Sequence, residues 1–179
     1  MSSATCDARR LFLALWPGDR ERRAIDDLAR SIPGVGQIRA DRLHLTLVFL
    51  GATHPDRLAC YEAVLGGIRI PRMVLTLDRI GYWRRPRLLW LGIDDSSAKL
   101  QDLVGELKNR LRRCGFSPEQ RSFRPHVTLR RKFHGPVPTR FPGKPISWQV
   151  DGITLVESQT DMPGSSYRVL RRWANVPQG

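Results

Sequence analysis

The stretch RLHLTLVFLG, residues Arg42–Gly51, has the composition of a core strand into which two polar residues are inserted. Leucines occupy positions 43, 45 and 47, and His44 and Thr46 alternate with them. Because successive side chains of a strand point to opposite faces, the leucines share one face and the two polar residues share the other. We expect a strand over residues 42–50 that buries its leucines and presents an imidazole and a hydroxyl opposite them.

The same pattern returns in RPHVTLRR, residues Arg124–Arg131, where His126 and Thr128 share a face opposite Val127 and Leu129. Each copy follows a predicted strand and a predicted helix, since LFLALW precedes the first and LLWLGI the second. This repeat of order and motif predicts two similar lobes related by a pseudo-twofold axis. The polar strand faces of the two lobes would then meet in a central cleft.

The remaining pattern predicts an α+β fold. A chain of 179 residues suits one compact domain, here residues 1–179, with a sizeable core. Several connections are short hairpins, which favours largely antiparallel sheets, with helices outside, over a doubly wound parallel sheet. Further strands are expected at residues 11–16, 74–80, 87–93, 124–130, 148–157 and 167–173, and a long loop at 132–145. Helices are expected at 19–32 with Asp19 as N-cap, from Pro55 to the glycines at 66–67, and from a cap at 94–97 to Gly115.

Arginine dominates the charge of the chain, which has a net charge of +13 and a pI of about 11.0. Such a charge favours polyanions through phosphate contacts and counterion release. Nucleic acid or a nucleotide phosphate is therefore the expected partner. The alternative is a genome-wide preference for arginine codons that has no functional meaning.

The cysteines and the apolar runs indicate an intracellular protein. No apolar run approaches the roughly 18 residues of a membrane span, and no small-residue cleavage site follows the short run at 11–16. We expect a cytoplasmic monomer that makes no membrane contact. Cys6, Cys60 and Cys114 are odd in number, widely spaced and without a CxxC motif. Three reduced thiols are therefore expected rather than a disulfide or a zinc site.

Two histidines and two threonines that converge on one cleft suit phosphodiester hydrolysis. One imidazole can take a proton from the attacking water and the other, as imidazolium, can protonate the leaving oxygen, because an unperturbed histidine has a pKa of about 6.5. Threonine hydroxyls can bond the non-bridging oxygens, and an arginine can stabilise the transition-state charge. The strand faces carry no carboxylate, so neither a metal nor another cofactor is expected. One His-x-Thr strand alone is more often structural, and it is the duplication that favours a function.

HLTLVFLG and PHVTLRR resemble the paired HxTx signatures of the two-histidine (2H) phosphoesterase superfamily. The stronger similarity is to its RNA 2′,3′-cyclic phosphodiesterases, also called 2′-5′ RNA ligases. The order of the other segments is similar over almost the whole chain: RRLFLALWP, RLLWLGI, SFRPHVTLRR, LVESQT and GSSYRVLRRW. The resemblance implies a bilobal α+β fold and an enzyme that hydrolyses 2′,3′-cyclic phosphate ends to 2′-phosphomonoesters without a metal.

Residue by residue, the resemblance assigns His44 as the proton donor to the departing 3′ oxygen. It assigns His126 as the base that activates water, and Thr46 and Thr128 as the threonines that contact the phosphate. The family often continues the second motif as HxTxxR, which implies a phosphate-binding arginine at Arg131.

Two neighbours of the motifs are weaker candidates for substrate binding. Arg130 is adjacent to Arg131 and would point to the face opposite that of Arg131 in a continuing strand, and the HxTxxR pattern of the family favours Arg131. Phe49 lies five residues past His44, on the opposite face of a regular strand, so we expect it in the core. Only a twist or a bulge would bring Phe49 to a base.

Other polar and aromatic residues have less specific patterns. His54 and His134 lack a threonine partner and are expected at the surface, while Tyr167 is expected in the core. Residues 82–85, Tyr-Trp-Arg-Arg, form a basic aromatic turn that either stacks on an RNA end or is a solvated hairpin. The long loop at 132–145 either borders the cleft or serves as a linker.

Three functions stay open once the resemblance is taken into account. Beyond hydrolysis of cyclic phosphate ends, the same site would suit reversible 2′-5′ RNA ligation or hydrolysis of a cyclic phosphate outside RNA. The third is a non-catalytic module that binds RNA or nucleotides, although binding alone does not need a matched acid–base pair.

Overall fold

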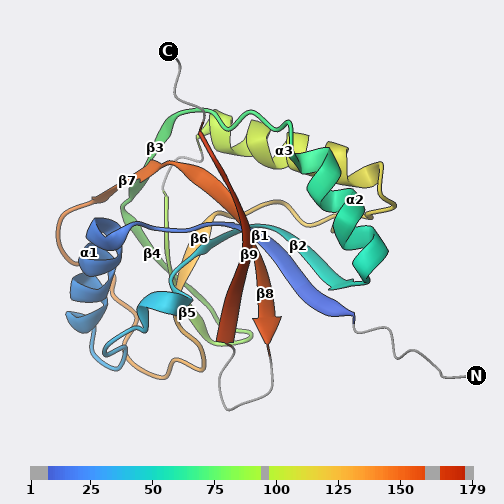
Figure 1. The fold of residues 1–179 in the computed structure, drawn as a ribbon. Coiled ribbons are helices and arrows are strands. Elements are labelled where there is room, and N and C mark those ends of the chain that lie inside the picture. Colours follow the sequence, from blue (N-terminus) through green and yellow to red (C-terminus); the bar gives the residue numbers. More distant parts are fainter. Residues whose placement is uncertain (1–7, 94–96, 160–165, 176–179) are drawn as a thin grey trace, which may run out of the picture.

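The computed structural model describes residues 8–93, 97–159 and 166–175, which form two β-sheets and three α-helices (Figure 1). The first half of the chain contributes β1 (Arg9–Leu15), α1 (Asp19–Arg30), β2 (Leu45–Thr53), α2 (Pro55–Leu65), β3 (Met73–Leu77) and β4 (Arg79–Trp83). The second half contributes β5 (Leu88–Gly92), α3 (Ala98–Arg112), β6 (His126–Arg130), β7 (Ile146–Val150), β8 (Gly152–Gln159) and β9 (Ser166–Ala174). This element content confirms the predicted α+β class.

Seven strands form the larger sheet in the order β4-β5-β6-β2-β1-β8-β9, and β3 and β7 form a second, two-stranded sheet. The strand pairs are antiparallel, as predicted. The larger sheet consists of two groups of strands, because a single residue pair, Leu45 with Val127, joins β2 to β6. The units β1-α1-β2 and β5-α3-β6 therefore meet at β2 and β6, the two strands of the repeated motif. Their division into two lobes about a twofold axis stays a prediction.

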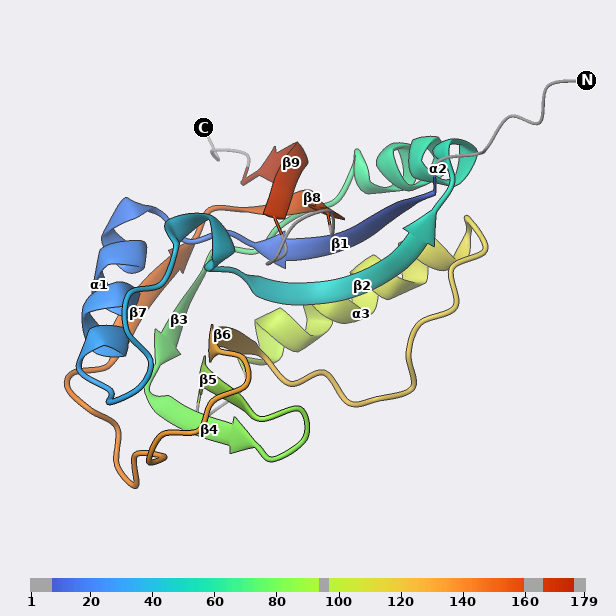
Figure 2. The same ribbon diagram turned by 90° about the horizontal axis from the view of Figure 1, so that it is seen from below.

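The apolar residues that alternate with the motif form part of the core. Leu43, Leu45 and Leu47 are 3% exposed or less. α1 lies at one end of the molecule beside β7, and α2 and α3 pack together at the other end (Figure 1, Figure 2). The predicted inner face of α3 is buried in full: Leu100, Leu103, Val104, Leu107 and Leu111. The leucine face of the motif thus anchors β2, and its polar face is turned away from this core.

Three predicted strands are divided in the structure or differ from it by more than two residues at an end. β2 begins at Leu45 rather than at position 42, because Ala40–Arg42 form a 3₁₀ turn before it. The strand predicted at 74–80 is divided between β3 and β4, which lie in different sheets, and 148–157 is divided between β7 and β8. Continuous apolar patterns concealed both divisions, because periodicity reports which face is buried and not which sheet buries it.

The helix starts follow the sequence signals with one correction. Gly18, and not Asp19, is the N-cap of α1, and Asp19 is the first helical residue. Pro55 begins α2, as expected for a residue that lacks an amide proton. The cap of α3 was expected at residues 94–97, of which 94–96 lie outside the described residues. The remaining residue, Ser97, is the N-cap. Within the described ranges, no helix is both long and apolar enough to cross a membrane.

The expectation of three reduced thiols is wrong for two of the cysteines. Cys60 of α2 and Cys114, just after α3, form a disulfide with their Cα atoms 5.9 Å apart. The packing of α2 against α3 creates this contact between residues that are 54 positions apart in the sequence. Spacing along the chain therefore carried no information on the pairing. Cys6 lies outside the described residues.

Candidate active site

The two motif histidines lie where the two groups of strands meet. His44 immediately precedes β2 and His126 is the first residue of β6. Leu45 pairs with Val127 in antiparallel register. Extended by one residue in each direction, this register sets His44 opposite Thr128 and Thr46 opposite His126. The fold thus brings together the four residues that the sequence repeat predicted to converge.

Both imidazoles are held in the same way by the backbone. Nδ1 of His44 lies 3.0 Å from the carbonyl oxygen of Arg42, and Nδ1 of His126 lies 2.8 Å from that of Arg124. A carbonyl oxygen can only accept, so in each ring Nδ1 carries a proton and donates it to this bond. In the neutral ring Nε2 then bears the lone pair, which is the state that a general base needs. Each histidine is anchored to the residue two positions before it. The two copies of the motif therefore share the same backbone anchor and the same imidazole tautomer.

A β-bulge follows each motif at the same position. On β2, Thr46 pairs with Ala14 while Val48 pairs with Leu13, so Leu47 is an extra residue. On β6, Thr128 pairs with Trp90 while Arg130 pairs with Leu89, so Leu129 is an extra residue. An extra residue shifts the alternation of side chains by one beyond the bulge. The residue five positions after each histidine therefore returns to the face of that histidine.

In the second motif this residue is Arg131. A regular strand would have placed Arg130 with His126 and Thr128, but the bulge at Leu129 turns Arg130 away from them, and Arg131 follows the end of β6. The positive charge of Arg131 lowers the pKa of both His44 and His126, which places it electrostatically within reach of both rings. The structure thus separates the two neighbouring arginines, and only Arg131 acts on the histidines.

In the first motif the corresponding residue is Phe49, and its expected place in the core is wrong. The Phe49 side chain is 46% exposed, because the bulge at Leu47 turns it to the polar face. Its ring stacks at 5.9 Å on that of Phe12, and the guanidinium of Arg10 lies 5.8 Å from it. Phe12 in turn lies 4.9 Å from the ring of His44. Phe49 is therefore an accessible aromatic surface on the His44 side of the site.

Aromatic rings surround His44, and sequence reasoning missed most of them. Trp16 stacks on the imidazole with ring centres 5.5 Å apart and planes 9° apart, and Tyr167 meets its edge at 4.9 Å. The expectation that Tyr167 lies in the core is confirmed only in part, because Tyr167 packs against the small buried cluster of Phe12, Ala14 and Val156 but is partly exposed and contacts His44. Alternation in LFLALW was the available signal, since Phe12 and Trp16 fall on the face opposite its leucines.

Two tryptophans flank His126 in a corresponding way. Trp83, at the end of β4, meets the imidazole edge-on at 4.6 Å, and Trp90 of β5 lies at 6.4 Å. The two indoles contact each other at 5.3 Å. Tyr82 points elsewhere, because it packs against Phe133 at 6.2 Å. Of the predicted basic aromatic turn, only the tryptophan contacts the catalytic candidates.

Comparison with known proteins agrees with this site. The family model of the 2′-5′ RNA ligase superfamily matches residues 17–162 of the chain. The chain belongs to this superfamily. An Escherichia coli RNA 2′,3′-cyclic phosphodiesterase is 34% identical over 171 residues, which cover 94% of this chain and 97% of the relative. A Thermus thermophilus RNA 2′,3′-cyclic phosphodiesterase is 30% identical over 92% of this chain and 89% of its own.

Solved structures of the superfamily share the whole fold. The crystal structure of Escherichia coli LigT complexed with 3′-AMP has a TM-score of 0.83 and 34% identity, and the match covers 94% of this chain and 98% of that one. LigT without a ligand matches with a TM-score of 0.84 and 33% identity over the same shares. The element order and the antiparallel sheet described above are therefore those of a 2H phosphoesterase.

Both histidines of this superfamily member are weak bases in the free protein. Burial is the main cause for His44, whose pKa falls from 6.5 to about 4; the bond to Arg42 opposes the change, and the charges of Arg131 and His126 add to it. Burial also lowers the pKa of His126, again with a contribution from Arg131. The lowered pKa values favour the neutral form of both rings at pH 7 in the free protein.

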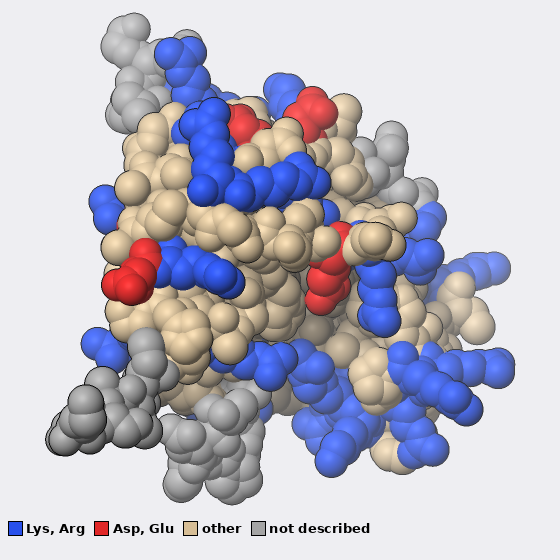
Figure 3. All heavy atoms as spheres, turned by 90° about the vertical axis from the view of Figure 1, so that its right-hand side faces the viewer, with Lys and Arg blue, Asp and Glu red and all other residues tan. Residues whose placement is uncertain are grey.

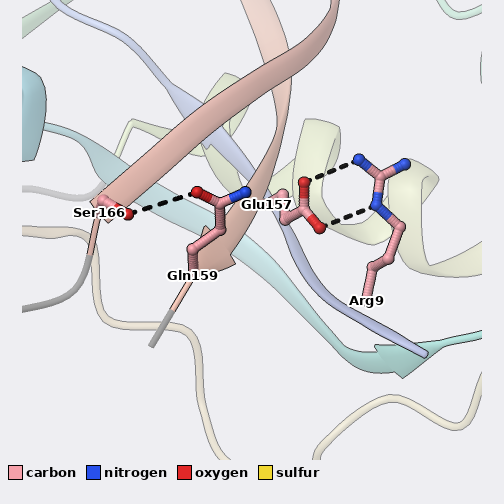
Figure 4. Close-up of polar contacts among 4 residues, drawn as sticks. All are labelled: Arg9, Glu157, Gln159 and Ser166. Carbon is pink, nitrogen blue, oxygen red and sulfur yellow. Dashed lines mark hydrogen bonds and ion pairs between the residues drawn. The ribbon is translucent and has the colours of Figure 1, made fainter. Parts of the chain in front are cut away.

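Basic side chains are prominent on the surface of the molecule. On the face that Figure 3 shows, lysine and arginine side chains outnumber the acidic ones. Glu157 of β8 is neutralised by Arg9, whose guanidinium donates bonds of 2.8 and 2.7 Å to its carboxylate (Figure 4). The same arginine lowers the pKa of Glu157. No group of three or more metal-binding side chains occurs among the described residues.

The remaining candidates lie apart from the histidines. His54 and His134 are exposed, as predicted. His134 contacts the guanidinium of Arg87 at 3.2 Å, in the turn between β4 and β5. A groove of about 400 Å³ lies between α1 and residues 142–147, and none of the predicted site residues lines it. This part of the predicted long loop packs toward α1.

Proposed function

We propose that this 2H phosphoesterase opens the 2′,3′-cyclic phosphate of RNA ends or nucleotides and yields a 2′-phosphomonoester. One observation carries the proposal. Two imidazoles on adjacent strands are both anchored through Nδ1, so both present Nε2 for proton transfer on one face of the sheet. A binding site would need only cations and donors, whereas hydrolysis of a cyclic phosphodiester needs one base and one acid.

The proposed reaction uses each side chain once. Water attacks phosphorus and gives a proton to Nε2 of His126, while the bond from phosphorus to O3′ breaks and O3′ takes a proton from the imidazolium of His44. Thr46 and Thr128, set beside the histidines by the strand register, donate to the non-bridging oxygens. Arg131 neutralises the charge that these oxygens gain in the transition state. Arg130 has no part, because the bulge separates it from the face of the histidines.

The superfamily relatives support this substrate class. The curated relatives at 34% and 30% identity are named RNA 2′,3′-cyclic phosphodiesterases, and LigT has been crystallised with 3′-AMP and with phosphate. The basic surface of this chain would attract RNA through contacts with its phosphates. We assign the acid to His44 and the base to His126 from the resemblance, because both rings have equivalent backbone anchors.

Product analysis on adenosine 2′,3′-cyclic phosphate tests the proposal. With a chelator present, we expect full turnover to adenosine 2′-phosphate. His44→Asn and His126→Asn should each reduce kcat/KM by at least about 10³-fold, as expected for loss of a general acid or base. His134→Asn is the matched control, because it removes an exposed imidazole outside the site, and it should retain activity within about twofold.

The outcomes separate the competing functions. Near wild-type activity in either of the two catalytic variants would refute the acid–base mechanism. A 3′-phosphate product would reverse the assignment of the leaving oxygen. Tight nucleotide binding without turnover of any cyclic phosphate would instead support a binding module. Loss of activity with the chelator, restored by a divalent cation, would contradict a metal-independent reaction.

We further propose that the enzyme acts as a monomer in the cytoplasm. The disulfide between Cys60 and Cys114 bears on this placement, because disulfides are rare in the reducing cytosol. Trapping the free thiols in intact cells, followed by mass spectrometry, measures their state. Two trapped thiols would agree with a cytoplasmic protein, and a fully oxidised pair would contradict it. Sedimentation of the purified chain tests the monomer.

A further inference from the structure

Aromatic rings meet the two histidines of the site in different ways. The indole of Trp16 is nearly parallel to the imidazole of His44, with planes 9° apart and ring centres 5.5 Å apart. The tryptophans beside His126 are instead steeply inclined to its ring, Trp83 at 75° and Trp90 at 66°. Among the ring contacts of the described residues, a parallel stack of tryptophan on a motif histidine therefore occurs at His44 and not at His126.

Strand pairing places Trp16 against His44. Leu15, the last residue of β1, pairs with Leu45, the first residue of β2. Extended by one residue, this antiparallel register sets Trp16 opposite His44, and side chains that are directly opposite share a face with their Cβ atoms about 4.5–5.5 Å apart. Pro17 follows, and a proline restricts the residue before it to extended backbone. The tryptophan therefore continues the direction of β1 before α1 begins.

The indole of Trp16 has a firm support of its own. It packs against a small buried cluster: Phe12, Ala14 and Val156. This cluster lies on the polar face of the motif, since Ala14 pairs with Thr46. The imidazole of His44 is thus held by two fixed groups, the carbonyl of Arg42 at Nδ1 and the indole on its face. Together they fix the direction of Nε2.

A parallel indole distinguishes between the two protonation states of an imidazole. The face of an indole carries partial negative charge, so it attracts a cation within about 6 Å of the ring centre. The imidazolium of His44 is such a cation, whereas the neutral imidazole gains no comparable attraction. The stack therefore favours the charged form, which is the form that a general acid needs.

The other surroundings of His44 mostly oppose its charge. The titratable and charged groups that face it come from other elements: Tyr167 of β9, His126 of β6, and Arg131 after β6. Burial lowers the pKa of the ring most, the bond to Arg42 raises it, and the charges of Arg131 and His126 lower it further. The indole thus supplies attraction to a ring that its charged neighbours repel.

We propose that Trp16 is a positioning residue for the general acid, because its indole fixes the plane of the His44 ring and stabilises the imidazolium by a cation–π contact. The inference rests on the proposed function, since it takes His44 as the acid. It adds a structural difference between two histidines whose backbone anchors are equivalent. The stacked ring is favoured in the charged form, and the ring without a parallel stack, His126, is the base.

The test measures the protonation of His44 without any turnover. Ring-proton shifts in NMR titrations give the pKa of His44 in wild type, Trp16→Leu and Trp16→Phe, each saturated with sulfate, an anion whose own charge is constant over the titration. Leucine keeps an apolar side chain on the ring but has no π face, so the pKa should fall by about one pH unit. Phenylalanine keeps a π face and should restore most of the loss.

The same variants are then assayed on adenosine 2′,3′-cyclic phosphate. Trp16→Leu should move the alkaline limb of the kcat profile about one unit to lower pH, so that kcat above this limb falls about tenfold. Trp16→Phe should retain most of the activity. Trp173→Leu is the matched control, because Trp173 of β9 packs against the main core and its ring lies beside Arg171, and it should retain kcat within about twofold.

Each result decides one point. If the pKa of His44 is unchanged or raised in Trp16→Leu, or falls equally in Trp16→Phe, the cation–π contact is absent and the inference is overturned. Equal losses of kcat in both variants without a change in the pH profile would reduce Trp16 to a packing role, which also overturns it. If circular dichroism shows that Trp16→Leu is unfolded, Trp16→Met replaces it, since methionine is apolar and has no aromatic face. If the wild-type protein converts no cyclic phosphate, the proposed function fails, and the titration still decides the role of Trp16.

Discussion

The free enzyme should contain almost no charged His44 at neutral pH. Burial lowers the pKa of this ring to about 4. Each pH unit above a pKa reduces the charged fraction tenfold, so about one molecule in 10³ carries the imidazolium at pH 7. The form proposed to be active, with His44 charged and His126 neutral, is therefore a minor species until an anionic substrate binds.

This population predicts the pH profile. Because kcat/KM reports the ionisations of the free enzyme, its maximum should lie below pH 6.5, and above pH 7 it should fall about tenfold per pH unit. The maximum of kcat should lie at higher pH, because the bound phosphate anion favours the imidazolium. Initial rates on adenosine 2′,3′-cyclic phosphate from pH 4 to 9 measure both, with circular dichroism at each pH to confirm folding.

Arg131→Gln perturbs the same equilibrium in a known direction. The positive charge of Arg131 lowers the pKa of His44 and His126, so its removal raises both pKa values and should move the kcat/KM maximum to higher pH. The variant should also lose about 10²–10³-fold in kcat/KM from weaker transition-state stabilisation. Arg130→Gln should change neither quantity. A wild-type maximum above pH 7, or an acidic shift in Arg131→Gln, would refute the reasoning.

Three further predictions concern the fold and the substrate side of the site. Replacing Cys60 and Cys114 by serine opens a loop of 54 residues and should lower the free energy of unfolding by about 4 kcal/mol in urea titrations, so an unchanged midpoint would contradict a formed disulfide. Gly81→Ala forces a Cβ atom against the indole of Trp90 and should cost about 1–3 kcal/mol by the same assay, whereas wild-type stability would show that the ring is free to move. Phe49→Ser should leave stability almost unchanged, because the ring is 46% exposed, but raise KM for the cyclic nucleotide several-fold, and an unaffected KM would exclude base stacking there.

The convergence of the site was available from the sequence because it depends on alternation. His44 and Thr46 are two residues apart, and so are His126 and Thr128, which forces each pair onto one face of a strand. The apolar faces of the same strands predict which side is buried. The sequence also indicated that the two motifs belong together, because each one follows a predicted strand and a predicted helix.

The choice between neighbouring residues was not available in this way. Residues 130 and 131 are both arginines, and they differ only in their position along the chain. A one-residue bulge at Leu129 reverses which of them faces the histidines, and a leucine is as compatible with a regular strand as with a bulge. The exposed position of Phe49 follows from the equivalent bulge at Leu47 and was equally hidden.

The sequence by itself determined the α+β class, the buried faces and the pair of histidines, because these depend on periodicity along single strands and helices. Only the tertiary structure decided the bulges, the aromatic rings around each imidazole and the disulfide between Cys60 and Cys114. These features depend on how separate elements pack in three dimensions, and no local pattern records the register or distance between them. The low pKa of His44 belongs with them, because burial produces it.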